Sequence, residues 1–187
     1  LSVLLLLPTN AQLKARWGSV DERYPVSCEA KVQGAEVNRA TAWKGERVNL
    51  QLVVSNRSGA GSECVVSYSF SELKNGKSVI PAVNVAGGFV QPVITDRFTG
   101  CGKHEVDAYG ENLVADRITA TNPTVMEGGS MRGLWLTVQV PQDAVAGTYK
   151  GYVELECEGK KSRYKYSIKV LDRTLPLPAE WKFHLDL

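Results

Sequence analysis

Residues 134–155 read LWLTVQVPQDAVAGTYKGYVEL, and every second residue from Leu134 to Val140 is leucine or valine. This period of two is typical of a strand with one buried side and one solvent-facing side. Pro141 ends the strand, because proline cannot donate a backbone hydrogen bond to a neighbouring strand. Gly147, which tolerates a positive φ, closes the turn before the chain returns. The stretch therefore predicts two consecutive strands joined by a turn.

The same alternation recurs at residues 48–54 and 164–170. Further strands are expected near residues 14–20, 36–43, 63–70, 78–85, 88–97 and 149–157. Turn sequences separate them, for example Asn-Gly at 75–76, Gly-Gly at 87–88 and Glu-Gly at 158–159. One core face per strand favours antiparallel pairing, and no window keeps a helical period. The pattern predicts an all-β fold, an antiparallel two-sheet β-sandwich of immunoglobulin or jelly-roll type.

Residues 98–130 interrupt this rhythm with many glycines and asparagines and one short apolar group. A loop this long in a compact domain is usually functional or docked on another surface. Within it, residues 101–107 read CGKHEVD and offer four potential metal ligands. Ligands so close in sequence rarely complete a coordination shell on their own, so we expect a solvated loop without metal or other cofactor.

The chain has 187 residues, 43% of them hydrophobic, and a formal net charge of +2. This is the composition of a globular domain that can bury one core without staples. A charge so close to zero provides no field that would attract nucleic acid, so nucleic acid is not an expected partner.

The first residues, LSVLLLLPTNAQ, combine a short apolar run with proline and small polar residues. We interpret residues 1–11 as the remnant of a secretory signal peptide, with a buried first strand as the alternative. The run is too short for a membrane span, which needs about 20 apolar residues. The expectation is an exported protein of the periplasm or the surface of a bacterium.

Export would place the four cysteines, Cys28, Cys64, Cys101 and Cys157, in an oxidising compartment. Their spacing does not choose among the possible disulfide pairings, and no Cys-x-x-Cys motif is present. Cys64 and Cys157 share strand faces with large apolar residues, so both should point into the core. There they either bridge the two sheets or remain buried thiols.

Side chains that could carry chemistry are few. The adjacent carboxylates Asp21 and Glu22 would suit glycoside hydrolysis if they faced one another. Neighbours on an extended chain point in opposite directions, however, and Arg23 is at hand to neutralise one of them. We interpret the pair as part of a turn with its ion pair.

The four tryptophans, Trp17, Trp43, Trp135 and Trp181, could stack on sugar rings, although packing in a core or interface is the commoner role. Trp135 lies between Leu134 and Leu136, on the face opposite the core run. We therefore expect it to be partly exposed or covered by another domain.

Several stretches occur together in one order. They are SVDERYP (19–25), WKGERVNLQLVV (43–54), Cys101-Gly102, Val114-Ala115-Asp116, the stretch 134–155 and RTLPLPAEWKFHLDL (173–187). In this combination the chain resembles the N-terminal β-sandwich domain that precedes the catalytic barrel in family-123 glycoside hydrolases and their uncharacterised bacterial relatives. The resemblance covers nearly all of residues 14–187.

The resemblance implies that residues 12–172 form the accessory sandwich. Residues 173–187 would be a stiff linker followed by the first strand of a (β/α)8 barrel. His184 and Asp186 would then lie at the end of that strand, near a substrate pocket. The candidates for the interface between the two domains are Trp135, Trp181, Cys101 and Asp116.

Characterised family members release β-linked N-acetylgalactosamine, using an acidic pair of the barrel together with the substrate's own 2-acetamido group. No position of this chain matches that pair, so no catalytic residue is implied here. The function implied is that of a non-catalytic domain which packs against its own downstream barrel and rims the cleft for the glycan substrate. The alternatives are an independent carbohydrate-binding module and an immunoglobulin-like surface interaction domain. The glycan, its linkage and the oligomeric state stay open.

Overall fold

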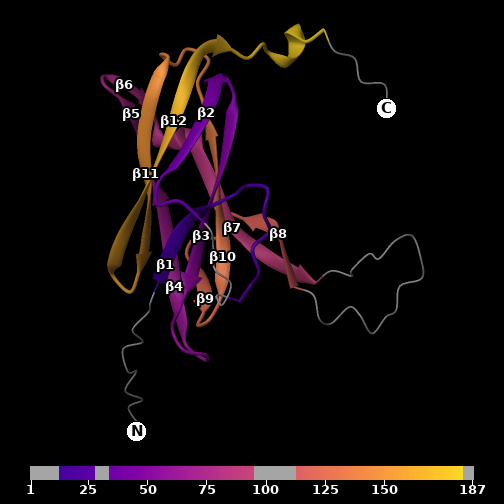
Figure 1. Cartoon of the computed structure of the whole chain (residues 1–187), viewed down its shortest axis with the longest axis vertical. Helices are drawn as coiled ribbons and strands as arrows, with labels where there is room; N and C mark the ends of the chain where they lie inside the picture. Colours follow the sequence, from indigo (N-terminus) through magenta and orange to yellow (C-terminus); the bar gives the residue numbers. More distant parts are fainter. Residues whose placement is uncertain (1–12, 28–33, 95–112, 183–187) are drawn as a thin grey trace, which may run out of the picture.

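The structure, a computed structural model, describes residues 13–27, 34–94 and 113–182. In these ranges the chain forms two β-sheets packed against each other (Figure 1). The predicted all-β sandwich is confirmed. The described residues contain no α-helix, only two short 3-10 helices, η1 (Ala82–Asn84) and η3 (Pro178–Glu180). None of these helices is long and apolar enough to cross a membrane.

The first sheet has five strands, all paired antiparallel, in the order β1-β3-β10-β7-β8. Their bounds are β1 (Leu13–Gly18), β3 (Arg47–Asn56), β10 (Met131–Gln139), β7 (Val85–Ile94) and β8 (Leu113–Thr119). The long pairing of β3 with β10 forms the middle of this sheet, and β1 and β8 are its edges.

The second sheet has seven strands, and five of them follow the order β2-β12-β11-β4-β9. Their bounds are β2 (Asn38–Lys44), β12 (Lys160–Thr174), β11 (Gly147–Cys157), β4 (Glu63–Phe70) and β9 (Thr124–Glu127). A small hairpin of β5 (Leu73–Asn75) and β6 (Ser78–Ile80) joins through β11.

The pair of β2 with β12 is parallel, so the expectation of antiparallel pairing throughout is wrong at this edge. The reason lies at Gly45, whose φ of 84° permits a tight turn between β2 and β3. β2 and β3 belong to different sheets, so this turn moves the chain from one layer to the other and does not make a hairpin.

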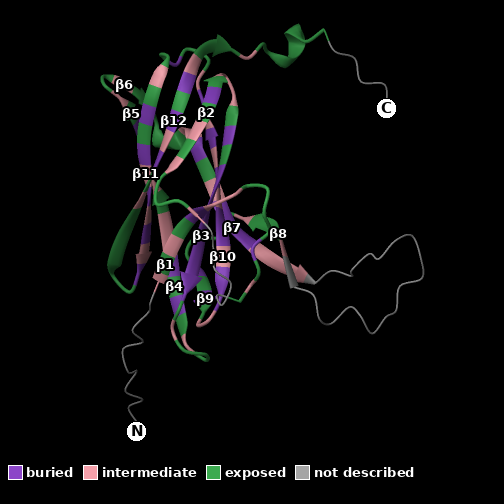
Figure 2. Ribbon diagram, viewed as in Figure 1, coloured by how far each residue is buried: buried purple, intermediate pink, exposed green. Residues whose placement is uncertain are grey.

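The core lies between the sheets, where buried and exposed residues alternate along most strands (Figure 2). Trp17 is only 2% exposed and packs edge-on against Tyr166, with ring centroids 5.6 Å apart. The hypothesis that Trp17 contacts sugar is therefore wrong, because its ring fills the core.

Two sequence expectations fail in β7 and in the segment before it. Gly87 and Gly88 were expected to form a turn, but they lie inside β7. A Cβ at Gly87 would come within 2.2 Å of the Trp135 carbonyl oxygen, and one at Gly88 within 2.0 Å of the Thr119 carbonyl oxygen. These glycines let strands approach closely. The strand expected over 78–85 is instead interrupted after Ile80, where Pro81 begins a 3-10 turn.

The expected loop 98–130 is also wrong in part, because β8 and β9 lie inside it. Both are edge strands of their sheets, so their sequences lack the alternation of a central strand. Asn122, between them, donates from its side chain to the Tyr68 carbonyl (2.9 Å) and accepts from the Tyr68 N–H (3.1 Å). The Asn122 side chain thus bonds the Tyr68 backbone in the way that a neighbouring strand would. The periodicity of a sequence cannot predict such a contact.

Cys64 and Cys157 are buried free thiols, and the prediction that they point into the core is confirmed. They lie on β4 and β11, which are neighbouring strands of the same sheet, so they cannot bridge the two sheets. Burial, reinforced by the neighbouring Cys157, raises the pKa of the Cys64 thiol to about 12. Cys28 and Cys101 lie outside the described residues.

Candidate functional site

The segment SVDERYP crosses the outer face of the five-stranded sheet. Tyr24 packs there with Val53 and Met131 in a small second cluster of buried residues. Its hydroxyl accepts a hydrogen bond from the Ser19 N–H at 2.8 Å. Burial raises the pKa of the Tyr24 hydroxyl, and the nearby Glu22 carboxylate raises it further. The hydrogen bond from the Ser19 N–H acts in the opposite direction but does not cancel these effects. The segment is thus anchored by an aromatic ring on a face that the alternation had predicted to be wet.

The side chain of Gln51, on β3, also binds this segment. Its side-chain amide donates to the carbonyl oxygens of Ser19 (2.7 Å) and Glu22 (3.1 Å). Gln51 is only 4% exposed, so both bonds are shielded from water. The turn at Asp21 is closed further by its N–H, which donates to the Ser19 hydroxyl at 3.1 Å. The interpretation as a turn is confirmed for Asp21, and Glu22 directly follows that turn.

Trp135 forms the floor of a trough beside this segment. It lies on the outer face, half-buried as predicted, and its cross-strand neighbours are Gln51 and Gly88. The far wall belongs to β7 and β8, with Val90 and Ile118 among its side chains. The cavity measures about 260 Å³. It brings together residues from four sequence stretches that are far apart along the chain: 19–25, 43–54, 114–116 and 134–155.

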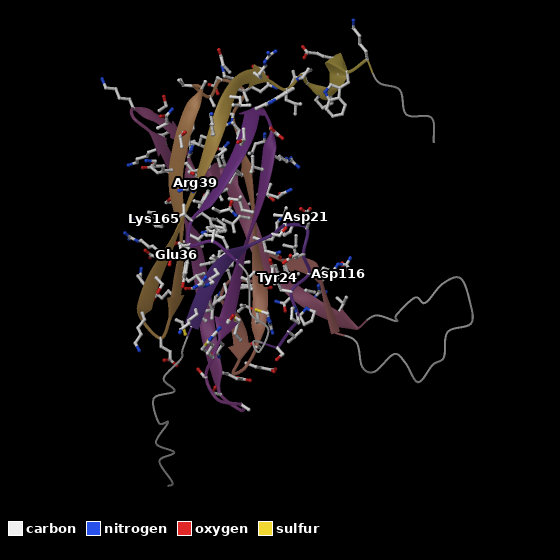
Figure 3. The ribbon with its side chains drawn as sticks, viewed as in Figure 1. Asp21, Tyr24, Glu36, Arg39, Asp116 and Lys165 are labelled. Carbon is white, nitrogen blue, oxygen red and sulfur yellow. The ribbon has the colours of Figure 1, made fainter. Side chains whose placement is uncertain are left out.

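One ion pair links the two walls. Arg23 lies 3.7 Å from the Asp116 carboxylate, and both side chains are largely exposed. Arg23 was expected to neutralise Asp21 or Glu22, but the ion pair that it makes in the described structure is with Asp116. Such an exposed pair contributes only about 0–1 kcal/mol to the stability of the fold. Its main effect is on the positions of the two side chains and on the local charge. Figure 3 shows Asp21, Tyr24 and Asp116 on the side of the ribbon that carries β8.

A second feature lies at the C-terminal end of β12. Here hydrogen bonds and an ion pair hold the chain against neighbouring segments as it leaves the sandwich, and we call this region the fastened end. Lys44 pairs with Asp172 at 2.6 Å, and the Lys44 carbonyl accepts from the Leu175 N–H at 2.8 Å. Gln142 donates to the Leu175 carbonyl at 3.4 Å. The Trp181 indole N–H then donates back to the Pro176 carbonyl at 2.9 Å.

Large apolar side chains are exposed at this same end. Trp181 is 52% exposed and Trp43, close to the end of β2, is 42% exposed. Val145, in the β10–β11 loop, and Leu177 are exposed as well. In Figure 1, η3 lies beyond the tips of β2 and β12, displaced toward the side of β8. Several large apolar side chains are therefore exposed at the same end of the sandwich.

A larger cavity, of about 800 Å³, is lined by residues of β1, the segment before β2, the end of β3 and the first part of β12. Its lining is rich in cations, among them Lys14, Arg57 and Lys165. No sequence pattern indicates this cavity, because these residues come from separate segments and form no cluster in the chain. Figure 3 shows Lys165 with Glu36 and Arg39, apart from the trough.

The remaining candidates stay predictions. His184, Asp186 and Cys101 lie outside the described residues, as does the stretch 101–107 that was considered for metal. Within the described ranges, no three potential ligands come together that could hold a metal ion. Of the four interface candidates, Trp135 and Asp116 both line the trough, while Trp181 lies at the C-terminal end.

The trough lies within a region of the chain that matches a known sequence profile, and the fastened end follows that region. A sequence profile described as the glycoside hydrolase 123 N-terminal domain matches residues 17–157. The chain belongs to this family. The matched span of this glycoside hydrolase 123 N-terminal domain contains every residue that lines the trough. The predicted resemblance is thereby confirmed.

Solved structures give the same picture of the fold. This family-123 domain is similar to a family 123 glycoside hydrolase from Clostridium perfringens, at 22% identity and a TM-score of 0.72. The match covers 90% of this chain and 28% of that one, so the chain spans just over a quarter of that structure. A pilin subunit, CooA of enterotoxigenic Escherichia coli, is far less similar: 16% identity, a TM-score of 0.38, and 84% and 97% of the two chains covered. No curated protein matches the chain.

Proposed function

We propose that this chain is a non-catalytic accessory β-sandwich of an exported glycoside hydrolase, which braces the catalytic domain that follows it and rims its cleft. The fastened end of β12 is the observation that carries the proposal. A module that only tethers or recruits would need a loose connection, whereas this end is held by backbone, side-chain and ionic contacts at Lys44.

Stiffness continues beyond these contacts. Pro176 and Pro178 fix their own backbone angles, and η3 folds Trp181 back onto the segment. The direction in which the chain leaves the sandwich is therefore set by the sandwich itself. The exposed apolar side chains around Trp43 and Trp181 would be covered by a domain held in that direction.

The family also supports a proposal for the parent enzyme. The relative from Clostridium perfringens is described by its hydrolysis of glycolipid glycans. We propose that the parent protein acts on glycans with terminal N-acetylgalactosamine in the periplasm or at the cell surface. His184 and Asp186 would lie close to its substrate pocket, and the acidic pair that performs hydrolysis would belong to the downstream barrel.

The alternative of an independent carbohydrate-binding module predicts a row of exposed aromatic rings on one sheet face. The four tryptophans do not form one: Trp17 is in the core, Trp135 is in the trough, and the other two are at the C-terminal end of the sandwich. For an immunoglobulin-like surface interaction domain, no specific observation in the described structure speaks in favour.

The parent protein, with its natural downstream region, provides the test. The sandwich alone should release no N-acetylhexosamine, and removing it should lower the melting temperature of the remainder. Val145→Ser, at the C-terminal end, should weaken the coupling between domains. Val125→Ser is the matched control, because that valine is similarly exposed on β9, at the opposite end of the sandwich. A remainder that keeps its full stability and activity without the sandwich would overturn the proposal.

A further inference from the structure

We propose that the trough over Trp135 is a subsite for a single uncharged hexopyranose ring. This inference deepens the bracing role, because it gives the sandwich a share in binding the glycan of the parent enzyme. It concerns a different surface from the fastened end, and it can be tested on this chain alone. Failure of the subsite would therefore leave the bracing role standing.

The size of the trough suits one ring. Its volume of about 260 Å³ lies below the roughly 300–1,000 Å³ of pockets that hold drug-sized ligands. A single pyranose is smaller than such a ligand, whereas an extended oligosaccharide would have to leave the trough at its rim. The trough is open to solvent on that side, so the remainder of a glycan would have a free path outward.

The lining separates into an apolar part and a polar part, as a sugar ring does. The indole of Trp135 and the aliphatic side chains of Val20 and Ile118 face the C–H groups that one side of a pyranose presents. Around the rim, the carboxylates of Asp21 and Asp116 can accept hydrogen bonds from hydroxyl groups. The larger cavity beside β1 has no tryptophan in its lining.

The formal charge of the lining favours uncharged sugars over anionic ones. The lining carries three carboxylates, those of Asp21, Glu22 and Asp116, and one guanidinium, that of Arg23, which leaves a formal charge of 3 − 1 = 2 negative units. An anionic sugar such as a sialic acid or a sulfated hexose would be repelled. An uncharged hexose avoids this repulsion, and the carboxylates still serve it as hydrogen-bond acceptors.

The walls are in place before any ligand arrives. Gln51 and Tyr24 hold the segment around Asp21 and Glu22 through the hydrogen bonds described above. The ion pair between Arg23 and Asp116 connects this segment to β8. A ring that enters therefore orders little of the protein, which improves affinity by reducing the entropic penalty of binding.

The test is a titration of this chain followed by two-dimensional NMR of its backbone and indole N–H groups. Methyl β-galactopyranoside and N-acetylgalactosamine should shift the Trp135 indole signal in a saturable way, with Kd in the millimolar range. N-acetylneuraminic acid should bind at least about tenfold more weakly. Tetramethylammonium serves as the probe for a cation site, and it should produce no saturable shift.

Two tryptophan variants provide the matched comparison, read from the side-chain amide signals of Gln51. Trp135→Leu should raise the Kd for methyl β-galactopyranoside by about threefold to tenfold, because stacking is lost. Trp43→Leu, which removes an exposed indole at the C-terminal end, should change it less than about twofold. Retained dispersion of the NMR spectrum shows that each variant is folded. Asp116→Asn, a change of one atom at the rim, provides a second variant that should weaken binding without disturbing the core.

Three outcomes would overturn the inference. The first is the absence of any saturable shift with either hexose. The second is an equal effect of the Trp135 and Trp43 variants. The third is a response to tetramethylammonium without a response to the hexoses, which would identify a site for a cationic group.

Discussion

Replacing Gly18 by alanine is expected to loosen the SVDERYP segment from the sheet. An added Cβ at this position would lie 2.3 Å from the Tyr24 hydroxyl oxygen, 2.7 Å from its ring carbon Cζ and 2.8 Å from a methyl group of Val53. All three distances are shorter than real Cβ contacts. The tyrosine cannot simply move aside, because its ring packs on Val53 and Met131 and its hydroxyl holds the Ser19 N–H.

Overpacking of this kind typically destabilises a protein by about 1–3 kcal/mol. Loss of the bond between Ser19 and Tyr24 would add about 0.5–1.5 kcal/mol. We therefore expect Gly18→Ala to lower the free energy of unfolding by about 2 kcal/mol or more. Urea unfolding followed by tryptophan fluorescence measures this directly, because Trp135 lies beside the affected segment.

Gly59→Ala is the matched control, since a Cβ there would meet nothing within 4 Å, and it should stay within about 0.5 kcal/mol of the parent chain. Tyr24→Phe removes the closest atom, so the double variant with Gly18→Ala should lose less stability than the sum of the two single variants. Strict additivity, or a Gly18→Ala protein as stable as the Gly59→Ala protein, would refute the packing described for Tyr24.

Further predictions concern the core. Tyr166→Phe should leave the free energy of unfolding unchanged or raise it by up to about 1 kcal/mol, because the buried hydroxyl lacks a hydrogen-bond partner in the described structure; a clear loss of stability in urea unfolding would show that the hydroxyl is bonded. Above pH 9.0 an unfolded cysteine ionises while Cys64, with its pKa of about 12, stays protonated, so the free energy of unfolding should fall as pH rises through this window. Cys64→Ala should flatten part of that slope, and an unchanged slope would contradict the assignment. Leu52→Ala, at a fully buried position of β3, should destabilise by about 2–5 kcal/mol in the same assay, whereas a loss below 1 kcal/mol would speak against the core as described.

The sequence predicts the sandwich because its central strands obey a simple rule. In β10 and the middle of β12, apolar and polar side chains alternate, and the structure buries the apolar set. The hairpin turn at Glu158 and Gly159, where both residues have positive φ, is equally clear from its sequence. Local periodicity and turn chemistry are properties of neighbouring residues, so one sequence is enough to reveal them.

The rest depends on contacts between distant segments. Val53 and Gln51 are buried on the outer face of β3 because SVDERYP lies over them, and nothing near β3 in the sequence announces that cover. Gly87 and Gly88 looked like a turn because glycine permits one, whereas here glycine is required by the close approach of β8 and β10. The edge strands β8 and β9 escaped detection because only one side of each is paired.

The candidate site was predicted in pieces. Trp135 and Asp116 were each singled out, from alternation and from resemblance respectively, but their meeting with Arg23 in one trough follows only from the fold. The lining cations of the larger cavity, such as Lys14 and Lys165, come from opposite ends of the chain, and their gathering is a product of topology alone.

The bracing role depends above all on the connection at Leu175, and amide hydrogen exchange of this chain measures that connection residue by residue. If the end of β12 is fastened, the Leu175 N–H, bonded to the Lys44 carbonyl at 2.8 Å, should exchange at least roughly a hundredfold more slowly than the same amide in an unstructured peptide. Exchange of Leu175 at the unstructured rate, while the amides of β12 stay protected, would show a free tether and contradict the proposal.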